Sequence, residues 1–334
     1  MHQQLTTAPL GETGIAISRV GLGTWAIGGP DWQWGWGAQD DDDSVRSILR
    51  AVERGVGWID TAAAYGFGHS EAVVARALST LPEADRPLVF TKCGLVDDGN
   101  GQAIRVGRPF SLIDEAHASL RRLATDRLDV LFLHWPPEDG TSLQDAWETL
   151  LRLRDEGVAR WIGVSNVDLE QLARLDALGR VDVVQPSLSL INRDVLDNGT
   201  LAWCAERGTG VVVYAPMASG ILSGRYDEQA AAALPAGDWR RENPDFSGEG
   251  LRRNLALVAR LREIAGEIGC SVGELAIAWT LHQAGVSGAI VGARRPDQVD
   301  GWTGAGELQL DDELLGQIAG ALEATGTGTG ERAY

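Results

Sequence analysis

Residues that can move protons stand where apolar stretches of the sequence end. Asp60 closes the stretch "VGWID", and Tyr65 follows five residues later among small residues and glycines. Lys92 stands near the end of "PLVFTKCG", and His134 near the end of "LDVLFLHW". Taken alone, Asp60 fits a helix cap, Lys92 a surface lysine and His134 a core histidine. Acids, lysines and histidines are costly to bury without partners, so their repetition at equivalent places indicates a shared site.

Together these four side chains can protonate a carbonyl oxygen. A tyrosine has a pKa near about 10 and is a poor acid at neutral pH. A nearby ammonium favours the phenolate, so Lys92 is predicted to lower the pKa of Tyr65, with Asp60 holding the ammonium in place. His134 can donate a hydrogen bond to a substrate oxygen. The set suits proton delivery as hydride reaches the carbonyl carbon.

A repeated pattern predicts the elements that position these residues. Short apolar stretches alternate with amphipathic ones eight times along the chain. This favours an α/β fold, a (β/α)8 TIM barrel, whose active site lies at the carboxyl ends of the strands. An open doubly wound sheet is the alternative, but "GLGTWAIGG" lacks the spacing GxGxxG. Helix caps are predicted at Ser44 and Ser70.

Segments outside the repeat are predicted at both ends of the chain. An N-terminal β-hairpin turns at Gly11–Gly14, and extra C-terminal helices include one near Asp311–Gly320. A long loop covers about 217–250 and leads into a helix in "RRNLALVARLREIAGEIG". We expect a single barrel domain over 1–334, with a flexible tail at about 322–334.

The composition limits the possible partners. The net charge of −18 disfavours nucleic acid and anionic membranes, and it requires a local positive cluster for any phosphorylated ligand. The apolar runs are shorter than the roughly 20 residues of a membrane helix. Three separated cysteines and five histidines without an HxH or HExxH pattern predict no metal site and no disulfide framework. A cytoplasmic protein is the simplest expectation.

The motifs resemble the aldo-keto reductase family, in particular its bacterial NADPH-dependent branch, from about Leu10 to about Ala305. The similar segments are "DTAAAYGFGHSE", "TKCG", "LHWP", "GVSN", "VVQPS", "YAPMASGILSG" and "IVGARRPDQV". The resemblance implies that Tyr65 is the proton donor, that Lys92 and Asp60 tune it, and that His134 orients the substrate.

The resemblance also implies an NADPH cofactor that lies extended across the barrel mouth. Ser165, Asn166 and Gln185 would bind its carboxamide, and Tyr214 would stack on the ring unless it is a core aromatic. Arg294 and Arg295 would bind the 2′-phosphate, unless they are a solvated pair, and Gln298 would reach the adenine. Further cofactor contacts are expected at Gly23, Thr24, Trp25, Ala215, Pro216, Met217, Ala218, Gly220, Leu222, Gly292 and Ala293.

One position departs from the family pattern. Many members carry Glu-Asn shortly after the glutamine, where this chain has Gly301 and Trp302. An indole cannot replace the amide as a hydrogen-bond acceptor. Trp302 is therefore expected either to stack on the ligand or to face the core.

A tryptophan-rich segment is the main candidate for substrate contacts. Four tryptophans lie between positions 25 and 36, where they form either a packed surface loop or an aromatic wall around a pocket. Such a wall suits sugars, polyols or aromatic carbonyls. The expected substrate residues are Trp25, Trp34, Trp36, Phe67 and Trp135, and Trp32 and the long loop around Trp239 are further candidates.

The predicted function is NADPH-dependent reduction of an aldehyde or ketone to the alcohol, or the reverse oxidation. The substrate is expected to be a small carbonyl or alcohol. The alternative is an NADPH-binding regulatory subunit with slow turnover, like the potassium-channel β subunits. Both a monomer and a homo-oligomer are compatible with the sequence.

Overall fold

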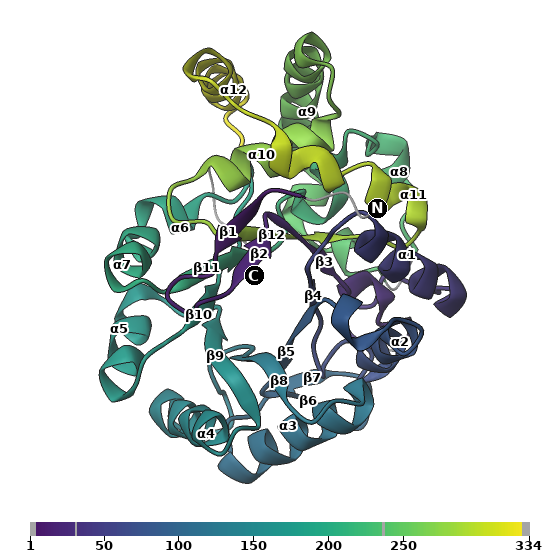
Figure 1. The fold of residues 1–334 in the computed structure, drawn as a ribbon. Helices are drawn as coiled ribbons and strands as arrows, with labels where there is room; N and C mark the ends of the chain where they lie inside the picture. Colours follow the sequence, from purple (N-terminus) through teal and green to yellow (C-terminus); the bar gives the residue numbers. More distant parts are fainter. Residues whose placement is uncertain (1–4, 31, 236–237, 329–334) are drawn as a thin grey trace.

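The computed structural model describes residues 5–30, 32–235 and 238–328, and they form a closed parallel barrel (Figure 1). The strand order around the barrel is β10-β11-β12-β3-β4-β5-β8-β9, which confirms the predicted (β/α)8 architecture. Both faces of these strands are covered, so they are apolar with little alternation. The barrel strands are β3 (Val20–Gly23), β4 (Trp58–Asp60), β5 (Leu88–Cys93), β8 (Leu128–Leu133), β9 (Ala159–Ser165), β10 (Val183–Gln185), β11 (Gly210–Val213) and β12 (Gly288–Gly292).

Helices surround the barrel, and two of them begin differently from the prediction. Asp40 caps the first helix by accepting from the Asp43 N–H, whereas Ser44 is buried inside that helix. Gly68 precedes the second helix, and Ser70 is buried one residue inside it. The helices are α1 (Asp41–Glu53), α2 (His69–Leu78), α3 (Pro109–Leu123), α4 (Leu143–Asp155), α5 (Leu169–Leu178), α6 (Asp194–Asp197), α7 (Thr200–Arg207), α8 (Glu228–Ala232), α9 (Gly248–Ile268), α10 (Val272–His282), α11 (Pro296–Asp300) and α12 (Asp312–Thr325).

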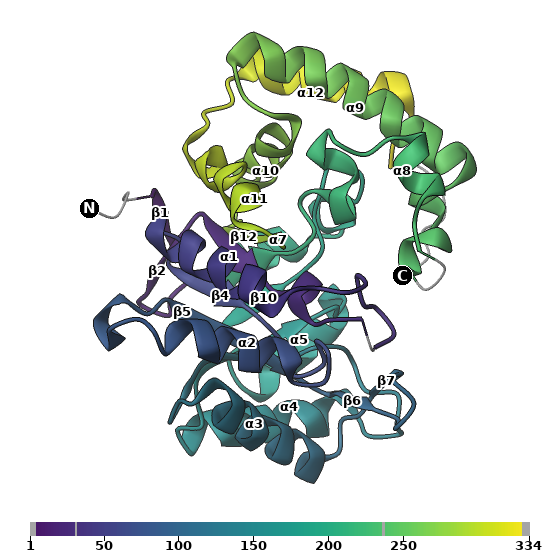
Figure 2. The same ribbon diagram turned by 90° about the vertical axis from the view of Figure 1, so that its right-hand side faces the viewer.

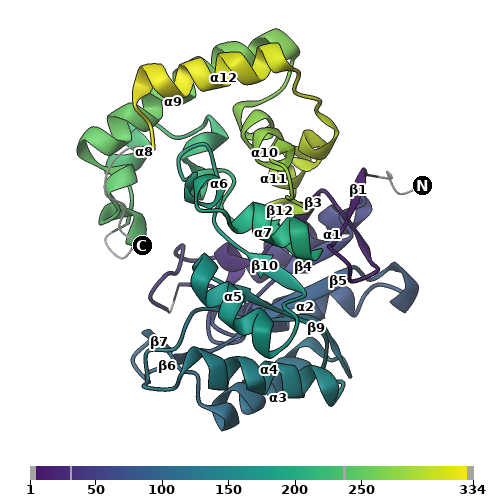
Figure 3. The ribbon, with the colours of Figure 1, turned by 90° about the vertical axis from the view of Figure 1, so that its left-hand side faces the viewer.

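The connection between β11 and β12 contains a helix that the sequence analysis missed. The predicted helix after the long loop is α9, which packs beside α12 as an outer pair away from the barrel (Figures 2 and 3). The unpredicted α10 packs against β12 and is buried along nearly its whole length. Because α10 is apolar on almost every side, it shows no amphipathic stripe. Ser271 and Glu274 form a capping box that could have revealed its start.

The predicted N-terminal hairpin is confirmed, and it covers the end of the barrel at which the strands begin. The opposite end, where the strands finish, is therefore the one that can hold a site. Strands β1 (Thr7–Pro9) and β2 (Ala16–Ser18) pair antiparallel. Leu10 and Ile17 pack with Trp58 and Phe90 at the amino ends of the strands. Figure 2 shows this hairpin at the end of the molecule opposite to a second, unpredicted hairpin. That second hairpin joins β6 (Leu95–Asp97) to β7 (Ala103–Arg105).

The chain after α12 is ordered further than expected. The helix continues to Thr325 and does not end near Gly320, and the Thr327 hydroxyl donates to the Arg253 carbonyl at 3.1 Å. The remainder of the predicted flexible tail, 329–334, lies outside the described residues. No single described helix has the length and apolar character of a membrane span; α9 and α10 meet that test only as a pair bent by 89°.

Candidate active site

A buried ion pair lies at the carboxyl ends of strands β4 and β5. The Lys92 Nζ atom lies 2.5 Å from Asp60 Oδ1, and it also donates to the Thr61 carbonyl at 2.9 Å and to the Tyr65 hydroxyl at 3.3 Å. Asp60 pairs with Phe90 in the sheet register, so Lys92, two residues later, points to the same face as Phe90. Parallel pairing therefore brings Asp60 and Lys92 together, and the contact of Lys92 with the hydroxyl adds Tyr65 from the loop after β4.

The loop after β4 holds Tyr65 above this ion pair. The Thr61 N–H donates to the Phe90 carbonyl and the Ala63 N–H to the Lys92 carbonyl, so the loop continues along β5. At Gly66 a Cβ atom would lie 1.9 Å from the Gly28 carbonyl oxygen, and φ is +61°. Glycine is thus required for the chain to turn away directly after Tyr65.

His134 lies beside Tyr65 with a polar ring atom that has no protein partner. The two ring centroids are 5.8 Å apart in an edge-to-face arrangement, and no hydrogen bond joins the two side chains in the described structure. The Tyr65 hydroxyl therefore contacts Lys92, while His134 meets Tyr65 only through the edge-to-face ring contact. His134 Nδ1 is buried and unpaired among the described atoms. A ligand oxygen is the kind of partner such an atom needs.

The pKa of Tyr65 shifts in the direction opposite to the predicted one. Burial, together with the nearby Asp60 carboxylate and Tyr214, raises the pKa of Tyr65 well above its usual value, so the expected lowering by Lys92 is wrong here. Burial lowers the pKa of Lys92, although Asp60 opposes this change. Burial, Lys92 and Arg105 lower the pKa of His134 well below its usual value. At neutral pH Tyr65 therefore carries its proton, and His134 is an uncharged imidazole.

An amide group holds the second oxygen of Asp60. Gln185 Nε2 donates to Asp60 Oδ2 at 2.8 Å, and the Ser165 hydroxyl donates to the main-chain carbonyl of Gln185 at 2.7 Å, which leaves the side-chain Oε1 of Gln185 free of this contact. Asn166 donates to the His134 carbonyl at 2.9 Å and accepts from the Tyr214 hydroxyl at 2.8 Å. All the predicted carboxamide ligands thus surround the ion pair. Gln185 keeps one N–H and its carbonyl oxygen for a ligand, which fits a nicotinamide carboxamide.

A group of buried hydroxyls supports the site from behind and was missed at the sequence level. The Ser70 hydroxyl donates to the Thr24 hydroxyl at 2.8 Å and lies 3.0 Å from the Thr61 hydroxyl. The Thr24 hydroxyl donates to the Asp60 carbonyl at 3.0 Å. These contacts fix the loop that carries Tyr65, and they explain why Ser70 does not cap α2. The motif "HSE" contained the signal, but it reads equally well as a helix start.

The loop after β11 has an unusual backbone that is tied to the protein itself. Ala218, Ser219 and Gly220 follow one another at positive φ, and the Ala218 and Gly220 N–H groups donate to the carbonyls of Ala215 and Met217 at 2.8 and 3.0 Å. These two N–H groups are therefore already engaged within the loop. Met217 is half-buried and packs on α10, whereas Leu222 is fully buried in the core, so its side chain cannot contact a ligand. Ala215 also has positive φ, and Pro216 follows it.

The turn after β12 uses its two arginines differently. Arg294 donates to Gln39 Oε1 at 2.6 Å, to the Trp36 carbonyl at 3.2 Å and to the Ala38 carbonyl. Arg295 is more than half exposed and pairs with Asp297 at 3.2 Å. Arg294 therefore anchors the tryptophan-rich loop, while Arg295 can still reach a ligand.

The other residues predicted to contact the cofactor near this turn are mostly engaged with the protein itself. The Gln298 carbonyl oxygen accepts from the Arg294 and Arg295 N–H groups, so it also holds the turn in place. Gly292 pairs with Gly23 between β12 and β3, and Ala293 is buried. Trp302 is 2% exposed and faces the core, which decides between its two predicted orientations.

The tryptophans form an aromatic wall beside Tyr65 rather than a separate surface loop. Trp25 is stacked with Tyr65 at 6.5 Å and with Trp239 at 5.6 Å between ring centroids. Trp32 lies 5.8 Å from the Tyr65 ring. Trp239 comes from the long loop after β11. The sequence could not show that this loop returns to the start of the barrel.

The other predicted substrate residues extend or flank this wall. The Trp25 indole donates to the Trp34 carbonyl at 3.0 Å, and Trp36 meets Trp25 edge-on. Phe67 contacts Trp32 at 6.4 Å. Trp135 lies at a different part of the rim, 4.2 Å beneath the Arg105 guanidinium of the unpredicted hairpin.

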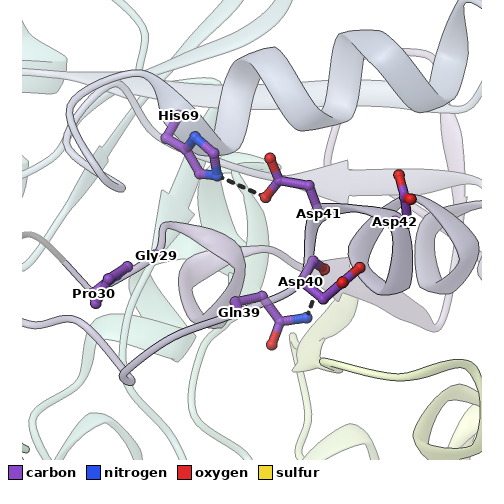
Figure 4. A pocket seen from close by; sticks show the side chains of 7 residues that line it. All are labelled: Gly29, Pro30, Gln39, Asp40, Asp41, Asp42 and His69. Atoms are coloured by element: carbon purple, nitrogen blue, oxygen red, sulfur yellow. Dashed lines mark hydrogen bonds and ion pairs between the residues drawn. The ribbon is translucent and has the colours of Figure 1, made fainter.

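An acidic hollow adjoins the outer side of the tryptophan-rich loop (Figure 4). His69 Nε2 and Asp41 Oδ1 are 2.9 Å apart across it. Its acidic side chains repel phosphate, so it is unsuited to the phosphate end of a cofactor. It is lined by Gly29, Pro30, Gln39, Asp40, Asp41, Asp42 and His69.

Comparison with known proteins agrees with this geometry. The sequence model described as "Aldo/keto reductase family" matches residues 19–323. The chain is 34% identical over 309 residues to the aldo-keto reductase YhdN of Bacillus subtilis, covering 90% of this chain and 91% of that protein. It is 34% identical over 330 residues to the NADH-specific methylglyoxal reductase of Escherichia coli, covering 94% and 98% respectively.

A solved structure agrees over the same extent. The glycerol dehydrogenase AKR11B4 from Gluconobacter oxydans superposes with a TM-score of 0.86 at 33% identity, covering 98% of each chain. The family match, the two relatives and this structure all span nearly the whole chain. The chain therefore belongs to the aldo/keto reductase family, whose members are oxidoreductases that act on carbonyl groups with a nicotinamide cofactor.

Proposed function

We propose that this protein reduces an aldehyde or ketone to the alcohol with NADPH, or catalyses the reverse oxidation, with Tyr65 as the general acid and base. The observation that carries the proposal is the contact chain from Asp60 through Lys92 to the Tyr65 hydroxyl, buried beside the unpaired Nδ1 of His134. The Asp60–Lys92 ion pair, the proton donor Tyr65 and the hydrogen-bond donor His134 thus meet at one place at the barrel mouth.

The residues around this chain fit the nicotinamide end of the cofactor. The remaining N–H and carbonyl of Gln185 match the acceptor and donor of a carboxamide, and Asn166 and Ser165 lie beside it. Tyr214 is tied to Asn166, which fixes its ring next to the same groups. When bound, the cofactor supplies hydride at C4 of its nicotinamide ring.

The protein side of the reaction is a proton transfer. Tyr65 carries its proton at neutral pH, and its raised pKa holds that proton until the alkoxide that develops on the carbonyl oxygen, a stronger base, takes it. Lys92, 3.3 Å away, stabilises the phenolate that remains, and Asp60 offsets the charge of the ammonium. Neutral His134 orients the carbonyl by donating one hydrogen bond. In the oxidative direction the phenolate takes the alcohol proton.

Cofactor preference is tested by Arg295→Ala. Its guanidinium is exposed and has only Asp297 as an ion-pair partner in the described structure, so we assign it to the 2′-phosphate. The dissociation constant for NADPH should rise far more than that for NADH. One relative is named as NADH-specific, so equal changes for both cofactors would refute this assignment.

The substrate is proposed to be a small polar carbonyl compound. Relatives are named for methylglyoxal and glycerol, which are both compact and polar. The aromatic wall of Trp25, Trp32 and Trp36 offers flat apolar surface and indole N–H groups to such a ligand. Steady-state assays with methylglyoxal, glyceraldehyde, dihydroxyacetone and benzaldehyde would rank the candidates. Tight NADPH binding without measurable turnover on the whole panel would favour a regulatory subunit instead.

A further inference from the structure

The hairpin β6–β7 places a cation at the barrel mouth, next to His134. Strand β7 ends at Arg105, which pairs with Leu95 at the base of the hairpin. The hairpin follows the carboxyl end of β5, and His134 follows that of β8, the neighbour of β5 in the barrel. The His134 N–H donates to the Cys93 carbonyl at 2.9 Å, so the two strand ends lie side by side. Arg105 therefore approaches the site from the side of His134.

The guanidinium of Arg105 lies against the loop that carries His134. It is 4.2 Å from the ring centre of Trp135, the residue directly after His134. Burial is the main cause of the lowered pKa of His134, and the charges of Lys92 and Arg105 add to that effect. The positive charge of Arg105 thus acts on the imidazole that is proposed to hold the substrate carbonyl.

Contacts on two sides hold the hairpin in this position. The Glu138 N–H donates to the Arg105 carbonyl at 3.2 Å, which ties β7 to the loop after β8. At the tip, the Gln33 N–H donates to the Gly101 carbonyl at 2.9 Å, and the Gln33 side chain accepts from the Ala103 N–H at 3.2 Å. The guanidinium is therefore in place before a ligand arrives, which lowers the entropic cost of binding.

The ion-pair partner of Arg105 leaves capacity for a ligand. In the described structure the Arg105 side chain donates through Nη1 to Glu138, and Nε and Nη2 remain for a second acceptor. The Glu138 side chain is 66% exposed, whereas that of Arg105 is 29% exposed. Glu138 can therefore turn into water at little cost, while the covered guanidinium keeps its place on Trp135.

We propose that Arg105 is a specificity residue that binds a carboxylate of the substrate, so that the protein prefers oxo acids to uncharged carbonyl compounds. The inference rests on the proposed function, because it assigns the second end of the substrate of that same site. The carbonyl meets Tyr65 and His134, and the carboxylate extends past Trp135 to the guanidinium. Arginine matches the two oxygens of a carboxylate with paired N–H groups. In a chain of net charge −18, an anionic substrate needs such a local cation.

The carboxylate serves only for binding. In the reduction, the carbonyl carbon gains the hydride and the carbonyl oxygen gains the Tyr65 proton, while the carboxylate is unchanged. Loss of the Arg105 contact should therefore appear mainly in KM for the oxo acid, because the contact is present both before and during the reaction.

Steady-state kinetics with two matched aldehydes tests the proposal. 4-Oxobutanoate and butanal have the same chain length, and only the first carries a carboxylate. The wild type should have the higher kcat/KM for 4-oxobutanoate. Arg105→Met keeps an apolar side chain on Trp135 but removes the charge. The ratio of the two kcat/KM values should then fall by roughly 10- to 100-fold. A ratio in Arg105→Met equal to that of the wild type would overturn the proposal.

Arg108→Met is the matched control. Arg108 lies in the same connection, but it contacts Asp139 at 3.4 Å and lies 5.5 Å from the ring centre of Phe110. Removing its charge should leave the ratio at the wild-type value. A fall as large as that in Arg105→Met would reveal a general effect of surface charge and would overturn the assignment to Arg105.

Glu138→Gln provides a test of opposite sign. The substitution removes the carboxylate that competes for the guanidinium, so the ratio should rise above the wild-type value. A fall of the ratio would show that Glu138 supports Arg105 and does not compete with a substrate, which contradicts the proposal. Thermal melting checks that each variant folds.

The same assays separate this inference from the proposed function. A second pair, 5-oxopentanoate and pentanal, covers a longer chain. If the wild type reduces the aldehydes of both pairs without preferring the oxo acids, only the inference fails. If it reduces none of these aldehydes and none of the carbonyl compounds of the panel above, the proposed function fails.

Discussion

Two buried ion pairs lie on opposite faces of strand β5, and only one of them is built for chemistry. In the inner pair, Lys92 points into the barrel mouth and pairs with Asp60. In the outer pair, Glu71 pairs with Arg122 of α3 at 2.5 Å. Thr91, the neighbour of Lys92, points outward and donates to Glu71 at 2.6 Å. Successive residues of a strand face opposite sides, so one strand serves both pairs.

The pairs differ in what remains available to a ligand. Each Glu71 oxygen has a protein donor, Thr91 for one and Arg122 for the other, in the contact region between α2 and α3. In the inner pair, Lys92 also reaches the Tyr65 hydroxyl, beside the unpaired ring nitrogen of His134. Each face holds one buried carboxylate and one cation, although Arg122 is 29% exposed and Lys92 is 1% exposed. The difference shows that a reactive site needs a group whose hydrogen bonding the protein leaves unfinished.

The largest expected effect is the loss of turnover in Tyr65→Phe, because this change removes the hydroxyl that Lys92 of the inner pair contacts. Removing the hydroxyl deletes the proton donor but keeps the ring that packs on Trp25 and Trp32. We expect turnover to fall by about 10²–10⁴-fold. The NADPH dissociation constant, measured by fluorescence titration, should stay near the wild-type value. Near-normal turnover would remove Tyr65 from the mechanism.

Lys92→Met should damage both activity and stability. Asp60 would be left as a buried charge with only Gln185 as a side-chain donor, so the free energy of unfolding should drop by about 3–5 kcal/mol. Urea denaturation measures this change. Adding Asp60→Asn should recover part of the stability but none of the turnover. Recovery of activity in the double variant would show that the inner pair is only structural.

Arg122→Met makes the matched change in the outer pair. Glu71 is fully buried and would keep only its contact with Thr91, so we expect a loss of about 3 kcal/mol in the free energy of unfolding. The kcat/KM of the folded variant should remain close to wild type. A loss of activity comparable to that of Lys92→Met would mean that the outer pair also controls the site.

A pH-dependent effect on stability is expected for Glu115 of α3, an acid of the same outer layer without a salt bridge in the described structure. It accepts from the Gly94 N–H at 2.8 Å, and burial raises its pKa from 4.5 to about 7. The protonated form is favoured in the fold, so this group's contribution to stability is complete below pH 4.5 and is lost as the pH rises to about 7. The loss should amount to about 3 kcal/mol.

Unfolding of Glu115→Gln between pH 4.5 and 8 checks this expectation. Glutamine keeps an acceptor for the Gly94 N–H but cannot ionise. The stability difference between variant and wild type should therefore change in favour of the variant as the pH rises. A difference that does not depend on pH would show that Glu115 does not titrate in this range.

Predictions at the strand ends succeeded because a parallel barrel has a fixed geometry. All eight strands point the same way, so Asp60, Lys92 and His134 had to reach the same mouth once the strands were recognised. Elements without a period or a strong local signal were missed. The helix α10 is apolar on nearly all sides, and the hairpin β6–β7 has only three residues in each strand.

The sequence by itself therefore determined the family, the barrel and the four chemical groups at its mouth, since these depend on residue type and strand direction. Tertiary structure decided how each group behaves. The pKa of Tyr65 rises because of burial and the nearby Asp60 and Tyr214, an effect that depends on distances in the fold and not on spacing in the sequence. The contact of Arg294 with Gln39 joins residues 255 positions apart, and no local pattern encodes it. Long-range packing thus turned a predicted cofactor ligand into the anchor of the aromatic wall.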